Sequence, residues 1–253
     1  MRILLTNDDG IHAPGILAMY LELARDHEVM VVAPETVQSA TGHGITLSAP
    51  LLTSKVTVPG GFNGIAVDGR PADCVKLAVA QLVAGPIELV ISGINSGANT
   101  GINVIYSGTV AAAIEAGFLG LPSIAVSLYL RATVEPDYAQ AARFAGQTIK
   151  SILDKGLVGG QIASVNLPAL KTGEQPAGIR FVRQCTKPWI DTYDRRKDPR
   201  GREYFWNSSL FTLTQTEDDT DMAGLRDGYI TVTPLQFDLT DHATLERWNT
   251  DEH

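Results

Sequence analysis

The chain opens with the stretch RILLTNDDG at residues 2–10, in which a short apolar run passes directly into two carboxylates and a glycine. The apolar run that ends at Thr6 predicts a buried β-strand. Apolar residues at helical spacing follow between Pro14 and Arg25, and residues 28–33 predict a second strand. A strand, a helix and a strand in this order form the repeating unit of a parallel sheet.

After the second strand and the loop that follows it, the chain predicts a hairpin or extended arm that reaches Val58. Strands and helices then alternate again up to residue 170. The sequence predicts helices at 71–83, 110–119 and 136–153, and strands at 87–91, 123–127 and 162–166. These strands are apolar throughout, which is typical of a parallel sheet covered on both faces. The right-handed crossover rule favours a doubly wound, Rossmann-like, mostly parallel α/β sheet. There are too few strand–helix units for an eight-stranded barrel.

The pattern changes after Pro168. Residues 172–192 and 202–214 predict antiparallel strands, residues 191–202 a charged loop, residues 229–234 a short strand and residues 241–250 a terminal helix. We therefore divide the chain into a catalytic core, 1–170, and a C-terminal extension of hairpins, strand and helix, 171–253. We expect the extension to pack on the core and on a partner subunit.

The composition is that of a globular protein with a sizeable core: 253 residues, 44% of them hydrophobic and 19% charged. The net charge is −8, and acids flank the basic run from Arg195 to Lys197, so we expect no nucleic-acid duplex as partner. Cys74 and Cys185 show no metal-ligand spacing. The N-terminus enters a strand directly, and no apolar run reaches the length of a membrane span. We therefore expect a cytoplasmic protein with no membrane partner.

Ligands of an open parallel sheet bind at the carboxyl ends of its strands, and the first polar cluster there is Asp8 with Asp9. Two adjacent carboxylates repel each other unless a cation lies between them, and oxygen ligands suit Mg²⁺, Mn²⁺ or Ca²⁺. Aspartate and glycine also form turns and helix N-caps. On this motif alone, a metal site and a cap are both open interpretations.

Two more clusters follow the next strands. Residues 38–44, QSATGHG, supply hydroxyls and His43. Residues 92–108 predict a long loop rich in Gly, Asn and Ser, and Ser107 and Thr109 stand at its end. The last two stand at the start of a predicted helix, where free N–H groups favour a phosphate, although either could simply cap the helix. Carboxylates, hydroxyls and an anion-binding helix start at one sheet edge predict phosphate-ester chemistry with a metal-activated water.

Other catalytic classes lack their motifs. There is no GxxxxGK[ST], HExxH or GxSxG, and Gly10 stands where a phosphoaspartate phosphatase carries its second aspartate. No GxGxxG follows the first strand, which argues against a dinucleotide-dependent oxidoreductase. A non-catalytic module that senses nucleotide or phosphate on the same fold is the alternative hypothesis.

Several segments resemble the SurE family of stationary-phase survival proteins and 5′-nucleotidases. They are residues 3–11, 13–15, 32–34, 38–39, 92–99, 106–112, 198–202, 220–221 and 228–235. The resemblance spans nearly the whole chain. It implies a Rossmann-like domain whose C-terminal part exchanges elements to form a homodimer, often paired into a homotetramer.

The resemblance also implies a metal-dependent phosphoric monoester hydrolase that acts on nucleoside 5′-monophosphates, with 3′-nucleotidase and polyphosphatase as side activities. One divalent cation per subunit, Mg²⁺ or Mn²⁺, would be held by Asp8, Asp9, Ser39 and Asn95. Asp8 and Asp9 would also serve in catalysis. The phosphate would lie against Asn95, Ser107, Gly108 and Thr109. Asn103 stands where relatives usually carry aspartate, which leaves the four metal positions intact.

Overall fold

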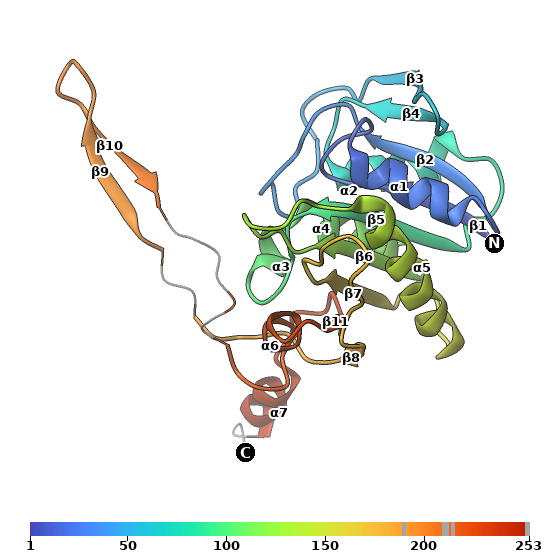
Figure 1. Cartoon of the computed structure of the whole chain (residues 1–253). Helices are drawn as coiled ribbons and strands as arrows, with labels where there is room; N and C mark the ends of the chain where they lie inside the picture. Colours follow the sequence, from blue (N-terminus) through green and yellow to red (C-terminus); the bar gives the residue numbers. More distant parts are fainter. Residues whose placement is uncertain (189–190, 209–212, 214–215, 251–253) are drawn as a thin grey trace.

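The computed structural model describes residues 1–188, 191–208, 213 and 216–250. Within these residues a nine-stranded sheet forms the middle layer, with helices on both faces (Figure 1). The strands are β1 (Arg2–Thr6), β2 (Glu28–Pro34), β3 (Thr53–Thr57), β4 (Asn63–Val67), β5 (Leu89–Ser96), β6 (Ser123–Leu128), β7 (Ile162–Leu167), β8 (Ile179–Phe181), β9 (Tyr193–Lys197), β10 (Glu203–Asn207) and β11 (Ile230–Leu235). The helices are α1 (Pro14–Leu23), α2 (Pro71–Leu77), α3 (Asn103–Tyr106), α4 (Gly108–Phe118), α5 (Tyr138–Asp154), α6 (Asp221–Arg226) and α7 (His242–Thr250), and α2 continues into a π-helical turn, η1 (Ala78–Leu82).

The strand order is β3-β4-β2-β1-β5-β6-β7-β11-β8. The six strands from β4 to β7 are parallel to one another. β3 pairs antiparallel with β4, β11 pairs antiparallel with β7, and β8 lies parallel to β11. The predicted doubly wound, mostly parallel α/β sheet is confirmed.

The buried strand β1 supplies side chains to both hydrophobic layers, because successive side chains of a strand point to opposite faces. Ile3 and Leu5 pack in the cluster that includes Ile16 of α1 and Ile149 of α5. Leu4 packs in the opposite cluster with residues of α2 and α4. The pairs α1 with α5 and α2 with α4 therefore cover the two faces. None of the described helices is both long and apolar enough to cross a membrane.

The prediction of a continuous loop at residues 92–108 is wrong in part. β5 continues through a register shift between Ser92 and Asn95 and ends only at Ser96. The short helix α3 occupies residues 103–106. Small and polar residues dominate the stretch, so the local sequence carries no apolar period, and pairing with β6 decides its structure.

The C-terminal expectations need two corrections. The expected charged loop at residues 191–202 contains β9, which pairs antiparallel with β10. Within 172–192, the described strand is β8, which lies parallel to β11 rather than in an antiparallel hairpin. Every residue of β9 and β10 is exposed, so neither strand shows an apolar alternation. Residues 189–190, 209–212, 214–215 and 251–253 of the expected extension lie outside the described residues.

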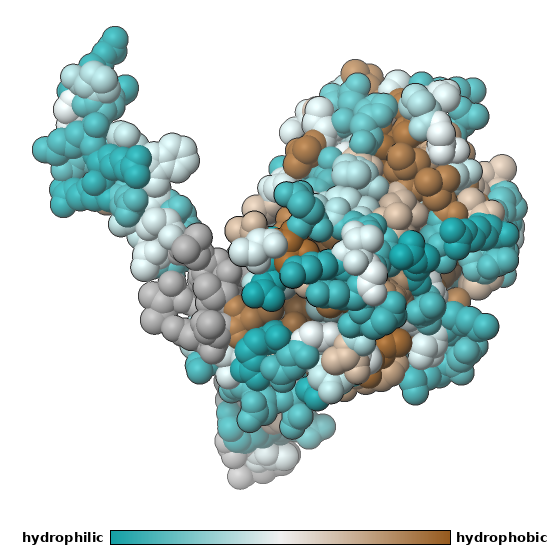
Figure 2. Space-filling view, in the orientation of Figure 1, coloured by the Kyte–Doolittle hydropathy of each residue, from teal (hydrophilic) through white to brown (hydrophobic). Residues whose placement is uncertain are grey.

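Part of the expected extension completes the core sheet, and part projects away from it. β11 and β8 extend the sheet beyond β7. The β9–β10 hairpin and α7, which has no buried residue, stand away from the sheet (Figure 1). Figure 2 shows mainly hydrophilic and intermediate residues on that hairpin. The division of the chain at residue 170 stays a prediction.

The buried carboxylate of Asp221 joins the C-terminal segment to the Asn-rich loop, the part of the Gly- and Asn-rich run that follows β5 at residues 97–102. It accepts hydrogen bonds from the backbone N–H groups of Gly101 (2.8 Å), Cys185 (2.9 Å) and Met222 (2.8 Å). Burial raises the pKa of Asp221, and these three donors oppose the rise. Because the donors come from three separate segments, the carboxylate joins the residues around Gly101 to those around Cys185 and Met222, beside the isolated bridge between Arg183 and Thr220.

We expect Asp221→Ala to destabilise the protein, because a buried donor left without a partner costs roughly 1–3 kcal/mol. Urea unfolding followed by circular dichroism measures this loss. Asp227→Ala is the matched control, since Asp227 is exposed, pairs with Arg226 and Arg180, and should change stability by about 0–1 kcal/mol. Equal losses in the two variants would contradict the anchoring role.

Candidate active site

Asp8 and Asp9 directly follow β1, at the carboxyl edge of the sheet. β1 lies between β2 and β5, and the chain reaches these neighbours through helices on opposite faces, α1 and α2. A crevice forms outside the strand ends where the winding reverses, and this is where open α/β sheets bind ligands. The predicted position of the carboxylate pair is therefore the ligand-binding edge of the fold.

The Asp8 side chain is buried against the start of α4. The Thr109 hydroxyl donates a hydrogen bond of 2.5 Å to Asp8 Oδ1. A Cβ atom added to Gly108 would lie 2.9 Å from Asp8 Cβ and 3.1 Å from Asp8 Oδ2. Because real Cβ atoms do not come this close, glycine at position 108 lets the helix start approach the carboxylate. Two of the predicted phosphate residues thus lie beside one predicted metal ligand.

Asp9, after β1, contacts the end of β5 at Ser96, the residue that follows Asn95. The backbone N–H of Ser96 donates to Asp9 Oδ2 at 2.8 Å. The Asn95 side-chain nitrogen donates to the carbonyl of Gly97 at 2.7 Å. Because that bond uses the nitrogen, the amide oxygen is the Asn95 atom available to a cation.

Ser39 lies in the loop that follows β2. The neighbouring Gln38 N–H donates to the Asp8 carbonyl at 2.7 Å, which places the loop at the same edge as the carboxylates. The Ser39 side chain is exposed, and no hydrogen bond to it occurs among the described residues. Its hydroxyl is therefore open to a ligand.

Ser107 caps α4. Its hydroxyl oxygen accepts a 3.1 Å hydrogen bond from the Val110 N–H, so the capping interpretation holds for Ser107. The Thr109 hydroxyl is engaged by Asp8, and its backbone N–H also faces that carboxylate. The start of α4 therefore stabilises negative charge at the site through backbone N–H groups as well as hydroxyls.

The electrostatics of the pair favour a cation. The pKa of Asp8 is raised to about 6: burial is the largest cause, the Thr109 hydrogen bond opposes it, and the neighbouring Asp9 carboxylate adds to the rise. Burial also raises the pKa of Asp9, against the Ser96 hydrogen bond. Ionising both carboxylates thus has a free-energy cost that a divalent cation would offset.

The chemistry of the donor set fits a hard divalent cation. No group of three or more His, Cys, Asp or Glu side chains able to hold a metal occurs in the described part of the chain. A cation here would therefore bind two carboxylates and neutral oxygens, which suits Mg²⁺ or Mn²⁺. In addition, Asn7 Oδ1 and Ser92 Oγ are buried at this edge with no partner among the described residues. A buried polar atom without a hydrogen-bond partner costs free energy, unless water or a ligand forms a hydrogen bond with it.

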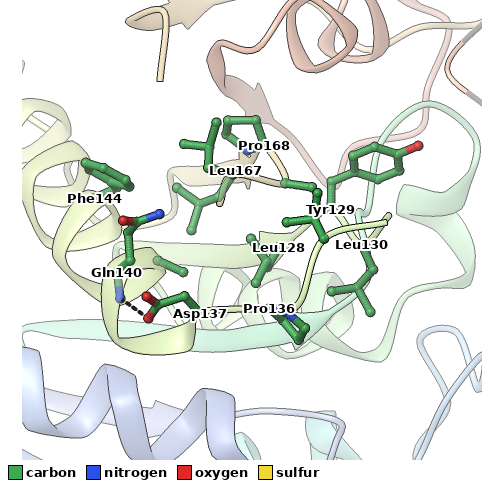
Figure 3. Close-up of a pocket in the computed structure, with 13 residues that line it drawn as sticks. Leu128, Tyr129, Leu130, Pro136, Asp137, Gln140, Phe144, Leu167 and Pro168 are labelled. Carbon is green, nitrogen blue, oxygen red and sulfur yellow. Dashed lines mark hydrogen bonds between the residues drawn. The ribbon is translucent and has the colours of Figure 1, made fainter. Parts of the chain in front are cut away.

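Of two cavities near this edge of the sheet, one has a candidate site residue in its lining and the other has none. The cavity in Figure 3 lies at the carboxyl ends of β6 and β7 and measures about 20 Å³, enough for about one water molecule. Apolar side chains such as Leu128, Phe144 and Leu167 line it. A second cavity of about 220 Å³ runs beside α4 and includes Ser107 and His43 among its lining residues. Only the second is large enough for part of an organic ligand.

The sequence patterns did not predict which residues hold the Asn-rich loop in place. The Asn99 backbone N–H donates to Asn166 Oδ1 and its side chain donates to Ser127 Oγ, each at 2.8 Å. Asn166 and Ser127 lie in β7 and β6 near their carboxyl ends, so the strand-end rule could have found them. Asp221 lies in a different segment, at residues 220–221 of the family resemblance, which implied no role for it. Asn103, the departure from the family pattern, begins α3.

We expect the stability of the metal-free protein to fall as pH rises from about 4 to 6. The unfolded Asp8 carboxyl loses its proton near 3.8, whereas the folded one retains it until about pH 6, so ionisation favours unfolding across that window. At pH 7.5 this costs up to roughly 3 kcal/mol. Asp8→Asn should remove that cost and be more stable than wild type.

Urea unfolding in EDTA between pH 4 and pH 8 measures the effect. Asp8→Asn and wild type should differ least at pH 4 and most at pH 7.5. Asp227→Asn serves as the control, because the pKa of this exposed carboxyl is lowered rather than raised. Parallel pH profiles for Asp8→Asn and wild type would refute the assigned cause.

Comparison with known proteins extends over the whole chain. The family model described as "Survival protein SurE" matches residues 3–191. A protein of Syntrophobacter fumaroxidans named 5′-nucleotidase SurE is 46% identical over 253 residues, covering 98% of this chain and all of its own. A relative of the same name in Carboxydothermus hydrogenoformans is 44% identical and covers 99% of this chain and 96% of its own. The crystal structure of the SurE protein from Aquifex aeolicus superposes with a TM-score of 0.85, at 34% identity, over 100% of both chains. These matches, together with the carboxylate pair at the sheet edge, show that the chain belongs to the survival protein SurE family.

Proposed function

We propose that this protein is a divalent-metal-dependent 5′-nucleotidase that hydrolyses nucleoside monophosphates to nucleoside and phosphate. The observation that carries the proposal is the contact between one member of the carboxylate pair, the buried Asp8, and a helix start at Thr109. The pair suits a cation and the helix start suits an anion, and a phosphate ester bound through a metal needs both. The name 5′-nucleotidase of the relatives described above supports the choice of substrate.

The cation would be one Mg²⁺ or Mn²⁺ per subunit, held by Asp8, Asp9, Asn95 and Ser39. When bound, such an ion neutralises charge on phosphoryl oxygens and makes water more acidic. The Thr109 and Ser96 hydrogen bonds hold the two carboxylates in fixed orientations. Preorganised ligands of this kind lose little conformational entropy when the ion binds.

The chain itself supplies the remaining steps. One of the two carboxylates takes the proton of the attacking water, as a general base does. The backbone N–H of Gly108, at the same helix start as Thr109, would stabilise the charge that develops on the phosphoryl oxygens, and Ser107 keeps that helix turn in shape by capping it. Asn95, near the end of β5, would hold the cation and the phosphate, and its amide oxygen is free to do so because its nitrogen donates to Gly97.

Purified protein should release inorganic phosphate from AMP or GMP with Mg²⁺ or Mn²⁺ and lose that activity in EDTA. Asp8→Asn and Asp9→Asn should each lower kcat at least about 100-fold at saturating metal, because each removes a charge on which catalysis depends. A malachite-green assay on a panel of 5′- and 3′-monophosphates and polyphosphate measures the rates. Asp227→Asn should leave them unchanged.

Full activity in either site variant would overturn the assignment of the pair. Calorimetry distinguishes the enzyme from the alternative hypothesis, a sensing module. A sensing module would bind a nucleoside monophosphate in the presence of metal and leave it intact. Binding without turnover by wild-type protein would favour the module over the enzyme.

We also propose that the protein is a homodimer or homotetramer. Exposed aromatic side chains on the projecting elements, Phe205 and Trp206 on β10 and Trp248 on α7, support this, because exposed large apolar groups mark interaction surfaces. Sedimentation analysis should give the mass of two or four chains. The mass of one chain across the concentration range would contradict the proposal.

A further inference from the structure

Three titratable side chains from three separate segments, Glu115, His43 and Lys76, meet beside the active site. Glu115 of α4 is only 4% exposed. Its Oε2 lies 2.8 Å from His43 Nε2, and its Oε1 accepts a 2.9 Å hydrogen bond from Lys76 of α2. Burial raises the pKa of Glu115, but the hydrogen bonds and charges of His43 and Lys76 more than offset this and hold the pKa below its ordinary value. Glu115 is therefore a buried anion with two partners.

His43 belongs to the loop that carries Ser39, and that loop is tied down along its length. At one end, the Gln38 N–H donates to the Asp8 carbonyl at 2.7 Å. At the other, Thr46 donates to the Asp73 carboxylate from its backbone and its hydroxyl. Between them, the Gly42 N–H donates to the Tyr106 carbonyl at 3.0 Å. The His43–Glu115 contact is the side-chain tie in this middle part.

The middle of the loop has a backbone that needs such a tie. Ala40, next to Ser39, has φ 54°, and Gly42 has φ 57°. The left-handed region is unfavourable for alanine, so contacts elsewhere must hold it there. The His43 ring also stacks on Phe118 of α4, with centroids 5.3 Å apart and planes at 16°. α4 thus holds the loop through Glu115 and Phe118, while the Ser39 hydroxyl makes no such contact of its own.

We infer that Glu115 is a positioning residue: through His43 it fixes the loop so that the Ser39 hydroxyl stays beside the carboxylate pair. The same helix carries Thr109, which holds Asp8. The helix α4 therefore holds both Asp8 and the middle of the Ser39 loop, while the Gln38 N–H joins the start of that loop to Asp8. The inference about the loop stands on the contacts alone, and its consequence for the metal rests on the proposed function.

Lys76 offers a way to separate positioning from simple charge balance. It contacts the same carboxylate as His43, but it lies on α2 and is half-exposed. Lys76→Met removes a partner of Glu115 without touching the loop. Glu115→Gln keeps a side chain that can hydrogen-bond His43, and His43→Phe keeps the stack on Phe118 but removes the bond to Glu115.

The test measures hydrogen exchange of loop peptides in the metal-free, full-length protein by mass spectrometry. His43→Phe and Glu115→Met should each speed exchange at residues 38–46 about tenfold, and the double variant should go no further, because both remove the same contact. Glu115→Gln should restore much of the protection. Lys76→Met and Glu22→Gln, whose carboxylate pairs with Arg25 on α1, should match wild type.

A second readout is the concentration of Mn²⁺ that gives half-maximal phosphate release. His43→Phe should raise it severalfold while kcat at saturating Mn²⁺ stays within about twofold of wild type, since a mispositioned ligand weakens binding of the ion first. Unchanged loop exchange in His43→Phe, or equal loosening in Lys76→Met, would overturn the inference. If the wild-type protein has no phosphatase activity, the proposed function is wrong. The hydrogen-exchange result would still test the positioning role of Glu115.

Discussion

The active edge of this protein depends on one contact, the buried carboxylate of Asp8 against the first turn of α4. The Thr109 hydroxyl donates to it, and Gly108 leaves no side chain in the way. Burial without a cation raises the pKa of Asp8 to about 6, so the same contact that fixes its geometry makes the metal-free site costly to ionise. A carboxylate in this position is stable as an anion only when positive charge or N–H groups surround it.

Much of the surrounding structure maintains that contact. β1 presents Asp8 because its apolar side chains are buried on both faces of the sheet. α4 can approach because it is rich in alanine and glycine, and Ser107 caps its first turn. The Ser39 loop is tied to Asp8 through Gln38 and to α4 through His43. Asn166 and Asp221 hold the Asn-rich loop from the other side. Stability and site geometry are therefore coupled through the same few hydrogen bonds.

Sequence and structure agree best where the pattern is local. The apolar strands β1, β2, β6 and β7 and the helices α1, α4 and α5 lie within a few residues of the predicted ranges. The structure brings Asp8, Asp9, Asn95 and Thr109 to one edge, as the strand-end rule indicates. The rule fails to find Glu115 because that residue sits in the middle of a helix, where a single glutamate normally faces solvent.

The sequence by itself determined the parallel core of the sheet, because buried parallel strands must be apolar throughout and their helices must alternate with them. It also determined which polar clusters follow the strands. Only the tertiary structure decided that β9 is a strand, since its residues are all exposed and show no period. The tertiary structure likewise decided that Ser107 caps α4 while Thr109 holds Asp8, and that Glu115 joins His43 to Lys76. These contacts join residues far apart in the chain, and no local pattern records a distance between them.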